Sequence, residues 1–323
     1  MSHSLRGQSL LSLADVNSET LFKLLKTAMN LKGRLAGGEH ESLTKILPGR
    51  VIVLVFQKPS LRTRASFEIA IRRLGGSSIY LAPGDVGLDT RERTEDVAKV
   101  LGRYADAIVA RVFGHDIVER LAQHAGIPVI NALSDMYHPC QALADLLTIT
   151  ETFGSPTGVK LTYVGDGNNV AHSLLLASAL AGMQITVACP RGYKPNPRVL
   201  EIAGRLAIAG ASFSVVHDPR EGVRDADVIY TDVWASMGEE HEAAERRVAF
   251  AGYQVNRELL EAARNGHERV VSGRRLPIVL HCLPAHYGEE ITEDVVAEHP
   301  EIFEQAENRL HAQMALLAQI LRR

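Results

Sequence analysis

The sequence predicts an α/β protein with two doubly wound parallel sheets in series, and three observations support this. Short apolar runs rich in β-branched residues recur along the chain, beginning with Val51–Phe56. Segments with apolar residues at helical spacing, such as Ser18–Leu35, separate these runs. Strict alternation of the two patterns is typical of parallel sheets covered by helices on both faces. The alternation restarts after Gly154–Gly158, which we expect to be a linker between two domains.

In the first half, the helix expected over Ser18–Leu35 begins at a Ser cap and ends near a glycine pair. Val51–Phe56 is apolar throughout, as expected of a strand buried on both faces. A helix through Phe67 then ends at Leu74, before Gly75 and Gly76. The elements expected next, in order, are strand Ser77–Leu81, helix Glu92–Tyr104, strand Ala107–Val112, helix His115–Ala125, strand Ile127–Asn131 and helix His138–Phe153.

The second half repeats the alternation. Its expected strands are Lys160–Val164, Gln184–Ala188, Ser212–Val216, Ala226–Thr231 and Ile278–His281. Its expected helices are Ala171–Ala181, Pro197–Ala209, the long polar stretch Glu239–Gln254, Arg257–Asn265 and Phe303–Leu321, the last packing back towards the first domain.

Composition narrows the class of protein. The net charge of −3 over 323 residues predicts no general attraction to nucleic acid or to anionic membranes. The three cysteines have no paired spacing, which indicates a reducing compartment and argues against structural zinc. The N-terminal segment lacks the pattern of a signal or transit peptide, and no apolar run reaches membrane-spanning length. We therefore expect a cytoplasmic protein.

The most informative stretch is the turn that follows Val51–Phe56. Ser60, Arg62, Thr63 and Arg64 crowd the passage from a buried strand to a helix N-terminus. Backbone N–H groups and the positive end of the helix dipole favour anions at such a position. Guanidinium groups can add bidentate charge-assisted bonds. This turn therefore predicts an oxyanion or phosphate site.

Polar residues also follow other strands. Arg111 ends one strand, at the sheet edge where ligands of open α/β sheets bind. His138 and Gln141 are three residues apart at a helix start, so both can face one small ligand. Asp232 follows a strand and is placed to pair with an ammonium group, and the loop Ser236–Gly238 comes next.

Two further motifs leave alternatives open. Gly165–Val170 lies between a strand and a helix but lacks the third glycine and the acidic residue of a dinucleotide site, so NAD binding is not expected. Its Asn168 and Asn169 either tolerate left-handed turn geometry or present an amide to a polar substrate. Cys282 follows another strand, and His281 should not activate it, because adjacent strand residues point to opposite faces.

Taken in order, these motifs resemble the carbamoyltransferase family, and most closely its ornithine branch. Ser-x-Arg-Thr-Arg at Ser60 and His-Pro-x-Gln at His138 belong to the wider family. Asp-x-Trp-x-Ser-Met-Gly at Asp232 and His-Cys-Leu-Pro-Ala at His281 point to the ornithine branch. The similarity extends to Glu307–Gln313, and so covers nearly the whole chain.

The resemblance implies transfer of the carbamoyl group of carbamoyl phosphate to the δ-amine of L-ornithine, which gives L-citrulline and phosphate in arginine biosynthesis. Carbamoyl phosphate is already activated, so neither a metal nor an organic cofactor is expected. The implied assembly is a homotrimer or a multiple of trimers. The implied domains are residues 1–150, completed by the C-terminal helix 308–323, for carbamoyl phosphate, and residues 151–307 for ornithine.

The resemblance also implies the site residues. Those around carbamoyl phosphate are Ser60, Leu61, Arg62, Thr63, Arg111, His138, Pro139, Cys140, Gln141, Cys282, Leu283 and Arg309. Those around ornithine are Asn169, Asp232, Ser236 and Met237. The expected catalytic set is Arg111, His138, Gln141, Asp232, Cys282 and Arg309.

The chain departs from the family pattern at two positions. Leu61 stands where the family often has Thr, which is harmless if this position contributes its backbone N–H. Gly87 stands where the family often has a Gln that touches carbamoyl phosphate, so that contact is not carried over. Arg91 or Arg93 is the candidate to compensate, across a subunit boundary.

Three other classes of function fit the sequence less well than transfer of a carbamoyl group to ornithine. A carbamoyltransferase for putrescine or for an N-acylated ornithine would not use the complete Asp232–Gly238 motif. A non-catalytic binding protein of the same fold would not need all of Arg111, His138, Gln141, Cys282 and Arg309. A dinucleotide oxidoreductase is disfavoured by the incomplete glycine motif.

Overall fold

The computed structural model describes residues 4–235, 240–264 and 270–322. The chain forms two compact units, residues 1–147 with 308–323, and residues 148–307. Two helices run through the boundaries between them, α7 (Pro139–Phe153) and α14 (Glu301–Leu321). Both units are α/β with parallel main sheets, which confirms the predicted fold class.

The first unit has a four-stranded parallel sheet in the order β2-β1-β3-β4. Its strands are β1 (Val51–Phe56), β2 (Ser77–Leu81), β3 (Ala107–Arg111) and β4 (Val129–Leu133). Its other helices are a 3-10 turn at Leu13–Asp15, α1 (Ser18–Ala36), α2 (His40–Leu43), α3 (Leu61–Arg73), α4 (Pro83–Val86), α5 (Thr94–Tyr104) and α6 (His115–Ala125).

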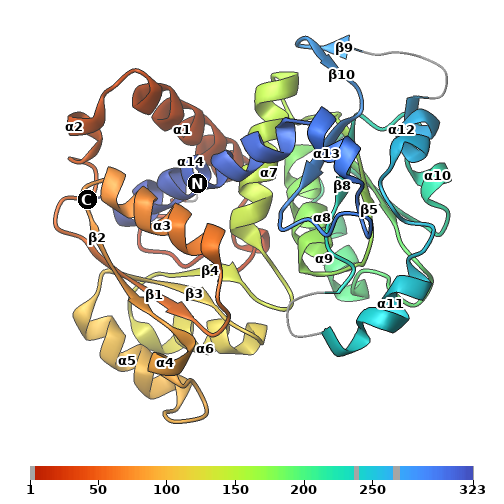
Figure 1. Cartoon of the computed structure of the whole chain (residues 1–323). Helices are drawn as coiled ribbons and strands as arrows, with labels where there is room; N and C mark the ends of the chain where they lie inside the picture. Colours follow the sequence, from red (N-terminus) through yellow and green to blue (C-terminus); the bar gives the residue numbers. More distant parts are fainter. Residues whose placement is uncertain (1–3, 236–239, 265–269, 323) are drawn as a thin grey trace. The chain divides into compact units, whose positions relative to one another are not determined.

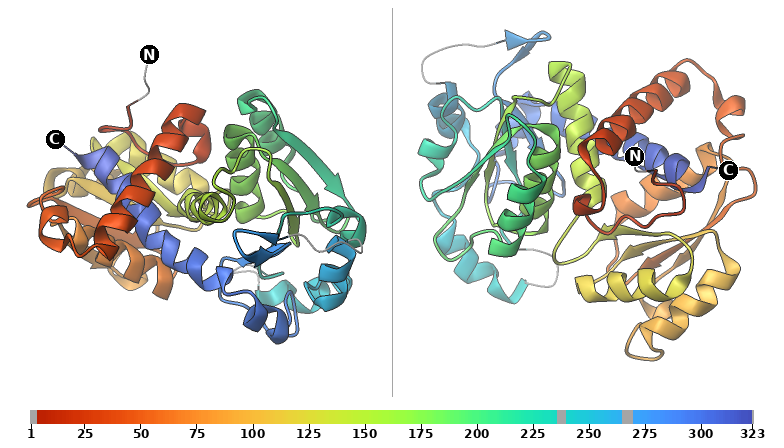
Figure 2. Two further views of the ribbon diagram at one scale, coloured as in Figure 1. Left: turned by 90° about the horizontal axis from the view of Figure 1, so that it is seen from above. Right: turned by 180° about the vertical axis from the view of Figure 1, so that it is seen from behind.

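Helices cover both faces of this sheet. Figures 1 and 2 show α5 and α6 on one face and α1, α3 and the C-terminal part of α14 on the other. Residues Ile52 to Phe56 of β1 are buried, as the apolar run predicted. The carboxyl ends of parallel strands lie at the same edge of their sheet. Phe56 and Arg111, the last residues of β1 and β3, accordingly pair with each other. The turn that follows β1 and Arg111 therefore lie at the same edge of the sheet.

The second unit has a five-stranded parallel sheet in the order β11-β8-β5-β6-β7. Its strands are β5 (Lys160–Val164), β6 (Gln184–Ala188), β7 (Ser212–Val216), β8 (Val228–Thr231), β11 (Ile278–His281) and a separate hairpin of β9 (Val270–Val271) with β10 (Arg274–Arg275). Its other helices are α8 (Asn169–Ala181), α9 (Pro197–Leu206), α10 (Pro219–Gly222), a 3-10 turn at Glu240–Glu242, α11 (Ala243–Ala249), α12 (Arg257–Arg264) and α13 (Glu293–Glu298). Helices α8 and α9 cover one face, and α10 and α12 the other (Figure 1).

One predicted helix is wrong in length. The polar stretch expected to be helical over Glu239–Gln254 begins outside the described residues, and its helix α11 ends at Ala249. The chain then turns so that Tyr253 and Val255 enter the core, and the Tyr253 hydroxyl donates to the carbonyl of His217 at 2.7 Å. Burial of these apolar side chains outweighs the helical tendency of the preceding polar residues. The short elements α2, α4, α10, α13, β9 and β10 were not predicted, because such lengths carry little periodicity.

The last part of α14 packs within the first unit, as predicted. Asn308 accepts a hydrogen bond from Lys32 Nζ at 2.8 Å, and Gln319 Nε2 donates to Thr27 Oγ1 at 3.0 Å. These contacts fix the register of α14 against α1. They bring Arg309, near the end of the chain, into the unit that contains the turn after β1.

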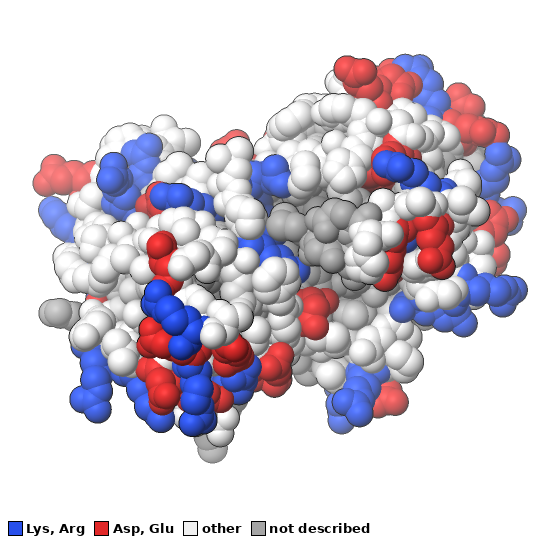
Figure 3. All heavy atoms as spheres, turned by 60° about the horizontal axis from the view of Figure 1, so that its bottom comes forward, with Lys and Arg blue, Asp and Glu red and all other residues white. Residues whose placement is uncertain are grey.

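The surface carries charges of both signs. On the face drawn in Figure 3, Lys and Arg are interspersed with Asp and Glu. This distribution agrees with the small net charge. Among the helices of the described residues, none combines the length and the apolar character needed to cross a membrane.

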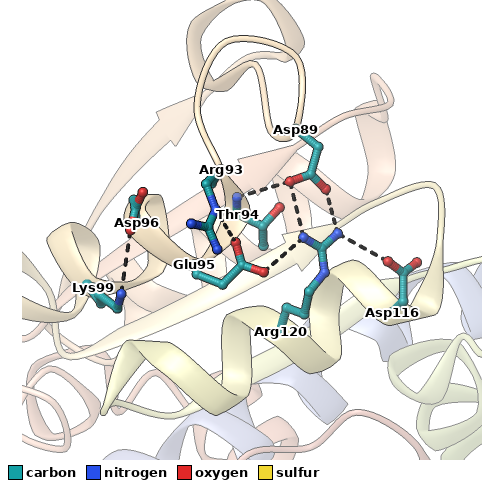
Figure 4. Close-up of polar contacts among 8 residues, drawn as sticks. All are labelled: Asp89, Arg93, Thr94, Glu95, Asp96, Lys99, Asp116 and Arg120. Carbon is teal, nitrogen blue, oxygen red and sulfur yellow. Dashed lines mark hydrogen bonds and ion pairs between the residues drawn. The ribbon is translucent and has the colours of Figure 1, made fainter.

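An ion-pair cluster around Arg120 ties the loop before α5 to α6 (Figure 4). Its guanidinium binds Asp89 through both terminal nitrogens, Glu95 Oε1 at 3.2 Å and Asp116 Oδ2 at 3.1 Å. Asp89 also accepts from the backbone N–H of Thr94 at 3.1 Å. The hydrogen bonds from Arg120 are the main reason that the pKa of Asp89 falls from 3.8 to about 2. Partial burial acts against this shift, and hydrogen bonds from Thr94 add to it.

We expect Asp89→Asn to lower the free energy of unfolding at pH 7 by about 1 kcal/mol, a value reduced for the partial exposure of the pair. Since the pKa of Asp89 is depressed in the folded state, its stabilisation is present above pH 3.8 and lost as the pH falls towards 2. Urea unfolding at pH 7, 5, 4 and 3 should show that the difference in free energy of unfolding between the variant and the wild type shrinks as the pH falls. Asn tolerates the left-handed backbone of residue 89 (φ 56°), so the change removes the charge alone.

Asp96→Asn is the matched control, because Asp96 lies on the neighbouring helix α5 outside the Arg120 cluster and makes an exposed 3.5 Å pair with Lys99 (Figure 4). Its effect should stay within about 0.5 kcal/mol at every pH. A gap for Asp89→Asn that persisted unchanged down to pH 3 would contradict the charge-based account.

Candidate active site

The turn after β1 becomes the first turn of α3. Ser60 is the N-cap, and its hydroxyl accepts from the backbone N–H of Thr63 at 3.4 Å. Leu61 is the first helical residue and its side chain is 81% exposed. The side chain at this position therefore points to solvent, while the helix start presents its N–H groups beside Arg62.

The two arginines of this turn diverge. Arg64 donates through Nε to Glu68 at 2.8 Å, and its guanidinium lies 3.8 Å from the centre of the Tyr80 ring. Arg62 is half-buried, and its charge contributes to lowering the pKa of His138. The sequence suggested both as anion ligands, but Arg64 is already held by Glu68 and Tyr80. Arg62 is the one whose charge acts on His138.

Arg309 of α14 connects three elements of the first unit. Its side chain is buried, and it donates to Thr63 Oγ1 on α3 at 2.7 Å and to Gln141 Oε1 on α7. A longer contact of 3.5 Å reaches His138 Nε2. Gln141 is itself fixed, because its Nε2 donates to Asp145 Oδ1 at 2.8 Å. The resemblance grouped Thr63, His138, Gln141 and Arg309, and the structure brings them into contact.

Burial and neighbouring charge keep His138 neutral. Its pKa lies well below 6.5, chiefly because burial disfavours the imidazolium, and then because Arg309, Arg111 and Arg62 are close. A neutral imidazole can still form hydrogen bonds without adding another cation. The region therefore combines three guanidinium groups with a neutral histidine, which suits an anionic ligand that also carries a carbonyl group.

Pro139 and Cys140 follow as the first two residues of α7. The Cys140 thiol is buried and donates to the carbonyl of Asn131 at 3.5 Å. Burial raises its pKa to about 12, with a small opposing effect of Arg309. Cys140 is therefore a neutral thiol that packs the start of α7, and Pro139 suits the first turn of a helix.

In the second unit, polar side chains meet at the carboxyl ends of β5, β8 and β11, which are neighbours in the sheet. Asp232 is buried, and Cys282 Sγ donates to its Oδ1 at 2.9 Å. Its Oδ1 also accepts from the backbone N–H of Val233 at 2.8 Å, and its Oδ2 from Asn168 Nδ2 at 3.0 Å. The carboxylate is thus oriented by three donors from three segments.

Asn168 makes a contact that the sequence did not predict. The resemblance implied Asn169 as a site residue, but Asn168 is the asparagine that binds Asp232. Asn168 is the N-cap of α8, and its Oδ1 accepts from the N–H groups of Val170 and Ala171. Its Oδ1 also accepts from the Tyr163 hydroxyl at 3.2 Å. A polar N-cap after a Gly-rich turn was the available signal. Asn169 is the first helical residue, with its carbonyl accepting from Ser173 Oγ at 2.8 Å.

Two buried tyrosines pack against each other near Asn168 and Asp232. The rings of Tyr163 and Tyr230 stack with centroids 5.8 Å apart, and both side chains are fully buried. Burial raises the pKa of Tyr163 well above 10, and the negative charge of Asp232 adds to this. The Tyr163 hydroxyl therefore keeps its proton for the bond to Asn168.

The segment after β11 contains Cys282 and Leu283. Leu283 adopts φ 57°, and its backbone N–H donates to His281 Nδ1 at 2.8 Å. The His281 Nε2 contacts Glu290 at 3.2 Å. The histidine thus faces Leu283 and Glu290 while Cys282 faces Asp232, in line with the expectation that His281 does not activate the thiol.

Five further positions bear on the sequence predictions. Ser236 and Met237 lie outside the described residues. Gly87 ends α4 in a left-handed conformation (φ 54°). Arg91 donates to the carbonyl of Asp85 at 3.0 Å, and Arg93 lies 3.5 Å from Glu95.

Residues 8–151 match the family model for "Aspartate/ornithine carbamoyltransferase, carbamoyl-P binding domain". Residues 157–320 match the model for "Aspartate/ornithine carbamoyltransferase, Asp/Orn binding domain". The chain is 50% identical to the ornithine carbamoyltransferase of Thermococcus kodakarensis over 321 residues, or 98% of each chain. It is 49% identical over 321 residues to a Pyrococcus furiosus protein named "Ornithine carbamoyltransferase, anabolic", again covering 98% of each chain.

Solved structures agree. The ornithine carbamoyltransferase of P. furiosus superposes with a TM-score of 0.90 at 48% identity, covering 99% of both chains. That of Thermus thermophilus gives 0.82 at 44% identity, covering 97% of this chain and 99% of its own. Full-length similarity of this kind, in sequence and in fold, shows that the chain belongs to the aspartate/ornithine carbamoyltransferase family.

Proposed function

We propose that the chain transfers the carbamoyl group of carbamoyl phosphate to the δ-amine of L-ornithine, giving L-citrulline and phosphate. The buried cluster of Arg309 with Thr63, Gln141 and His138 carries this proposal. Such a cluster can bind an anion and polarise a carbonyl at once. Full-length similarity to ornithine carbamoyltransferases supports the choice of acceptor.

On this proposal the first unit binds carbamoyl phosphate. The start of α3 holds the phosphate, through Ser60, the backbone of Leu61, Arg62 and Thr63. Arg111, His138 and Gln141 hold the carbonyl group, with Arg309 nearby and with Pro139 and Cys140 forming the helix start behind them. Cys282 and Leu283 complete the surroundings of the reacting carbon.

The second unit binds ornithine. The carboxylate of Asp232 faces a positive charge of the substrate, and Asn169, Ser236 and Met237 complete the contacts to the α-amino and α-carboxylate groups. Asn168 and Cys282 orient Asp232 through their hydrogen bonds. Free ornithine makes full use of such a carboxylate, whereas an N-acylated ornithine would leave it without its α-ammonium partner.

The reaction needs a neutral δ-amine. Its nitrogen lone pair attacks the carbonyl carbon, which forms a C–N bond and places negative charge on the carbonyl oxygen. The bond from that carbon to the phosphate oxygen then breaks, and the amine proton is released. Arg111 and His138 stabilise the oxyanion, and the α3 turn stabilises charge on the leaving phosphate. Orientation of two bound substrates supplies much of the remaining acceleration.

Cys282 acts as a neutral donor in this scheme. Its thiol donates to Asp232, so the proton resides on sulfur, and a thioester intermediate is not part of the reaction. Carbamoyl phosphate is activated by its phosphate leaving group, and the reaction as written uses no metal or organic cofactor.

The assembly and the setting are also proposed. We propose a homotrimer or a multiple of trimers, because the resemblance to the carbamoyltransferase family implies that assembly. The three cysteines form no disulfide with one another, in keeping with a cytoplasmic protein. The similarity to a relative named anabolic favours the direction of citrulline and arginine biosynthesis.

The test is citrulline formation from carbamoyl phosphate with ornithine, beside putrescine and N-acetylornithine as acceptors. We expect ornithine to be preferred by at least roughly a hundredfold in kcat/KM, because the alternatives each lose a charged contact. Turnover with another amine alone would keep the reaction class but overturn the acceptor site. Binding of carbamoyl phosphate without turnover of any amine would indicate a non-catalytic binding protein.

A further inference from the structure

The backbone at Leu283 adopts a conformation that needs outside support. Its φ of 57° lies in the left-handed region, which is disfavoured for a branched side chain without local side-chain hydrogen bonding. The residue directly follows Cys282, whose thiol binds Asp232. A change of backbone conformation at Leu283 would therefore move the donor that orients the Asp232 carboxylate.

The support comes from His281. The Leu283 N–H donates to His281 Nδ1 at 2.8 Å, so Nδ1 must be the unprotonated ring nitrogen. The ring proton then resides on Nε2, which donates to Glu290 Oε1 at 3.2 Å. A carboxylate that fixes a histidine tautomer in this way also fixes the ring orientation.

Glu290 holds a second point of the same loop. Its Oε1 also accepts from the backbone N–H of His286. Its own backbone is anchored, because its carbonyl accepts from the Val255 N–H at 2.8 Å. One carboxylate oxygen thus connects both ends of the loop from His281 to His286 to a neighbouring segment.

Burial makes a purely stabilising role a poor explanation. The side chains of both His281 and Glu290 are completely inaccessible to solvent. Desolvation of such polar groups offsets much of what their contact contributes, and an apolar pair of similar size is often as stable. The backbone N–H of His281 is held as well, by Gln305 Oε1 at 2.9 Å. The pair is therefore better explained by the specific loop conformation that it imposes.

A metal site would be another use of Glu290. His286, Glu289 and Glu290 place possible ligand atoms within 4.8 Å of one another. However, Glu289 already pairs with Arg247 at 2.7 Å, and Glu290 Oε1 accepts the two hydrogen bonds described above. The contacts to His281 and His286 account for Glu290 Oε1, whereas Glu290 Oε2 is buried without a hydrogen-bond partner among the described residues.

We propose that Glu290 and His281 are positioning residues, which fix the Cys282–Leu283 segment for carbamoyl transfer. This inference rests on the proposed function. It assigns the pair no contact with substrate; it acts through the Leu283 backbone and the Cys282 thiol. Glu290 supplies an acceptor for the His281 ring proton, so an amide oxygen at position 290 should serve in its place.

The test compares Glu290→Leu with Glu290→Gln in the full-length enzyme. Glu290→Leu removes the acceptor and should lower kcat at saturating substrates by at least roughly tenfold. Because the loop is no longer held, alkylation of Cys282 by iodoacetamide should become several-fold faster. Glu290→Gln keeps an acceptor oxygen and should restore kcat to within about threefold of wild type.

The matched control is Glu301→Leu, which removes another buried carboxylate beside a histidine in the same unit, His299 at 3.6 Å. It should lower the Tm without changing kcat or the alkylation rate. If it lowered kcat as much as Glu290→Leu at an equal loss of Tm, the effect would be general destabilisation and the proposal would be wrong. An unchanged kcat in Glu290→Leu would also overturn it.

A measurement on the unmutated protein keeps the test independent of folding defects. Nitrogen-15 NMR of the histidine side chains should show His281 as the neutral Nε2–H tautomer with a slowly exchanging ring proton. A ring protonated on Nδ1 would contradict the bond from Leu283. Absence of carbamoyl transfer by the wild type would instead refute the proposed function, which separates the two failures.

Discussion

Arg62→Ala is expected to weaken carbamoyl phosphate binding by roughly a hundredfold or more, since it removes a charge-assisted contact to a dianion. Arg62 lies in the first turn of α3, and its charge is felt by the buried His138. The remaining N–H groups of the helix start cannot replace a guanidinium. Isothermal titration calorimetry with carbamoyl phosphate alone measures the loss directly.

Arg64→Ala is the matched control, two residues along the same helix. Its guanidinium binds Glu68 and lies over Tyr80, so its loss should change carbamoyl phosphate affinity by less than about threefold and leave the free energy of unfolding almost unchanged. Equal losses of affinity in both variants would mean that general charge, rather than Arg62, holds the phosphate. Unchanged affinity in Arg62→Ala would refute the assignment of the phosphate site to this turn.

Asp232→Asn is expected to lower kcat/KM for ornithine by roughly a hundredfold, because it removes a buried charge that faces an ammonium group. The amide oxygen can still accept from Cys282 and the Val233 N–H, so the structural change is confined to the bond from Asn168, whose acceptor Oδ2 becomes an NH2 group. The affinity for carbamoyl phosphate should remain within about twofold of the wild-type value, since the charged contacts proposed for this substrate belong to the first unit. Steady-state kinetics with ornithine varied, together with calorimetry of carbamoyl phosphate, separates the two effects.

Cys282→Ser is the companion variant for Asp232. A serine hydroxyl can still donate to Asp232, so turnover should persist with a reduction of roughly tenfold or less, whereas a covalent thioester route would lose nearly all activity. If Asp232→Asn damaged carbamoyl phosphate binding as much as ornithine use, the division of labour between the two units would be wrong.

The sequence by itself determined the strands of the two sheets and the polar motifs that follow them. Apolar β-branched runs such as Val51–Phe56 and Lys160–Val164 gave strand bounds that agree with the structure, because a strand buried on both faces tolerates few polar residues. The motifs at Ser60 and Asp232 marked strand ends, where an open α/β sheet binds its ligands. The sequence did not predict the short elements or the end of α11, because their limits depend on packing rather than on periodicity.

Only the tertiary structure decided which of these polar side chains meet. Arg62 and Arg64 look alike in sequence, yet positions two apart on a helix point in nearly opposite directions, so Arg64 binds Glu68 instead. Arg309 is 246 residues from Thr63 and reaches it because α14 packs back on the first unit. Asn168 binds Asp232 because strands β5 and β8 are neighbours. Such contacts arise from how the elements pack, and local residue patterns do not encode that packing.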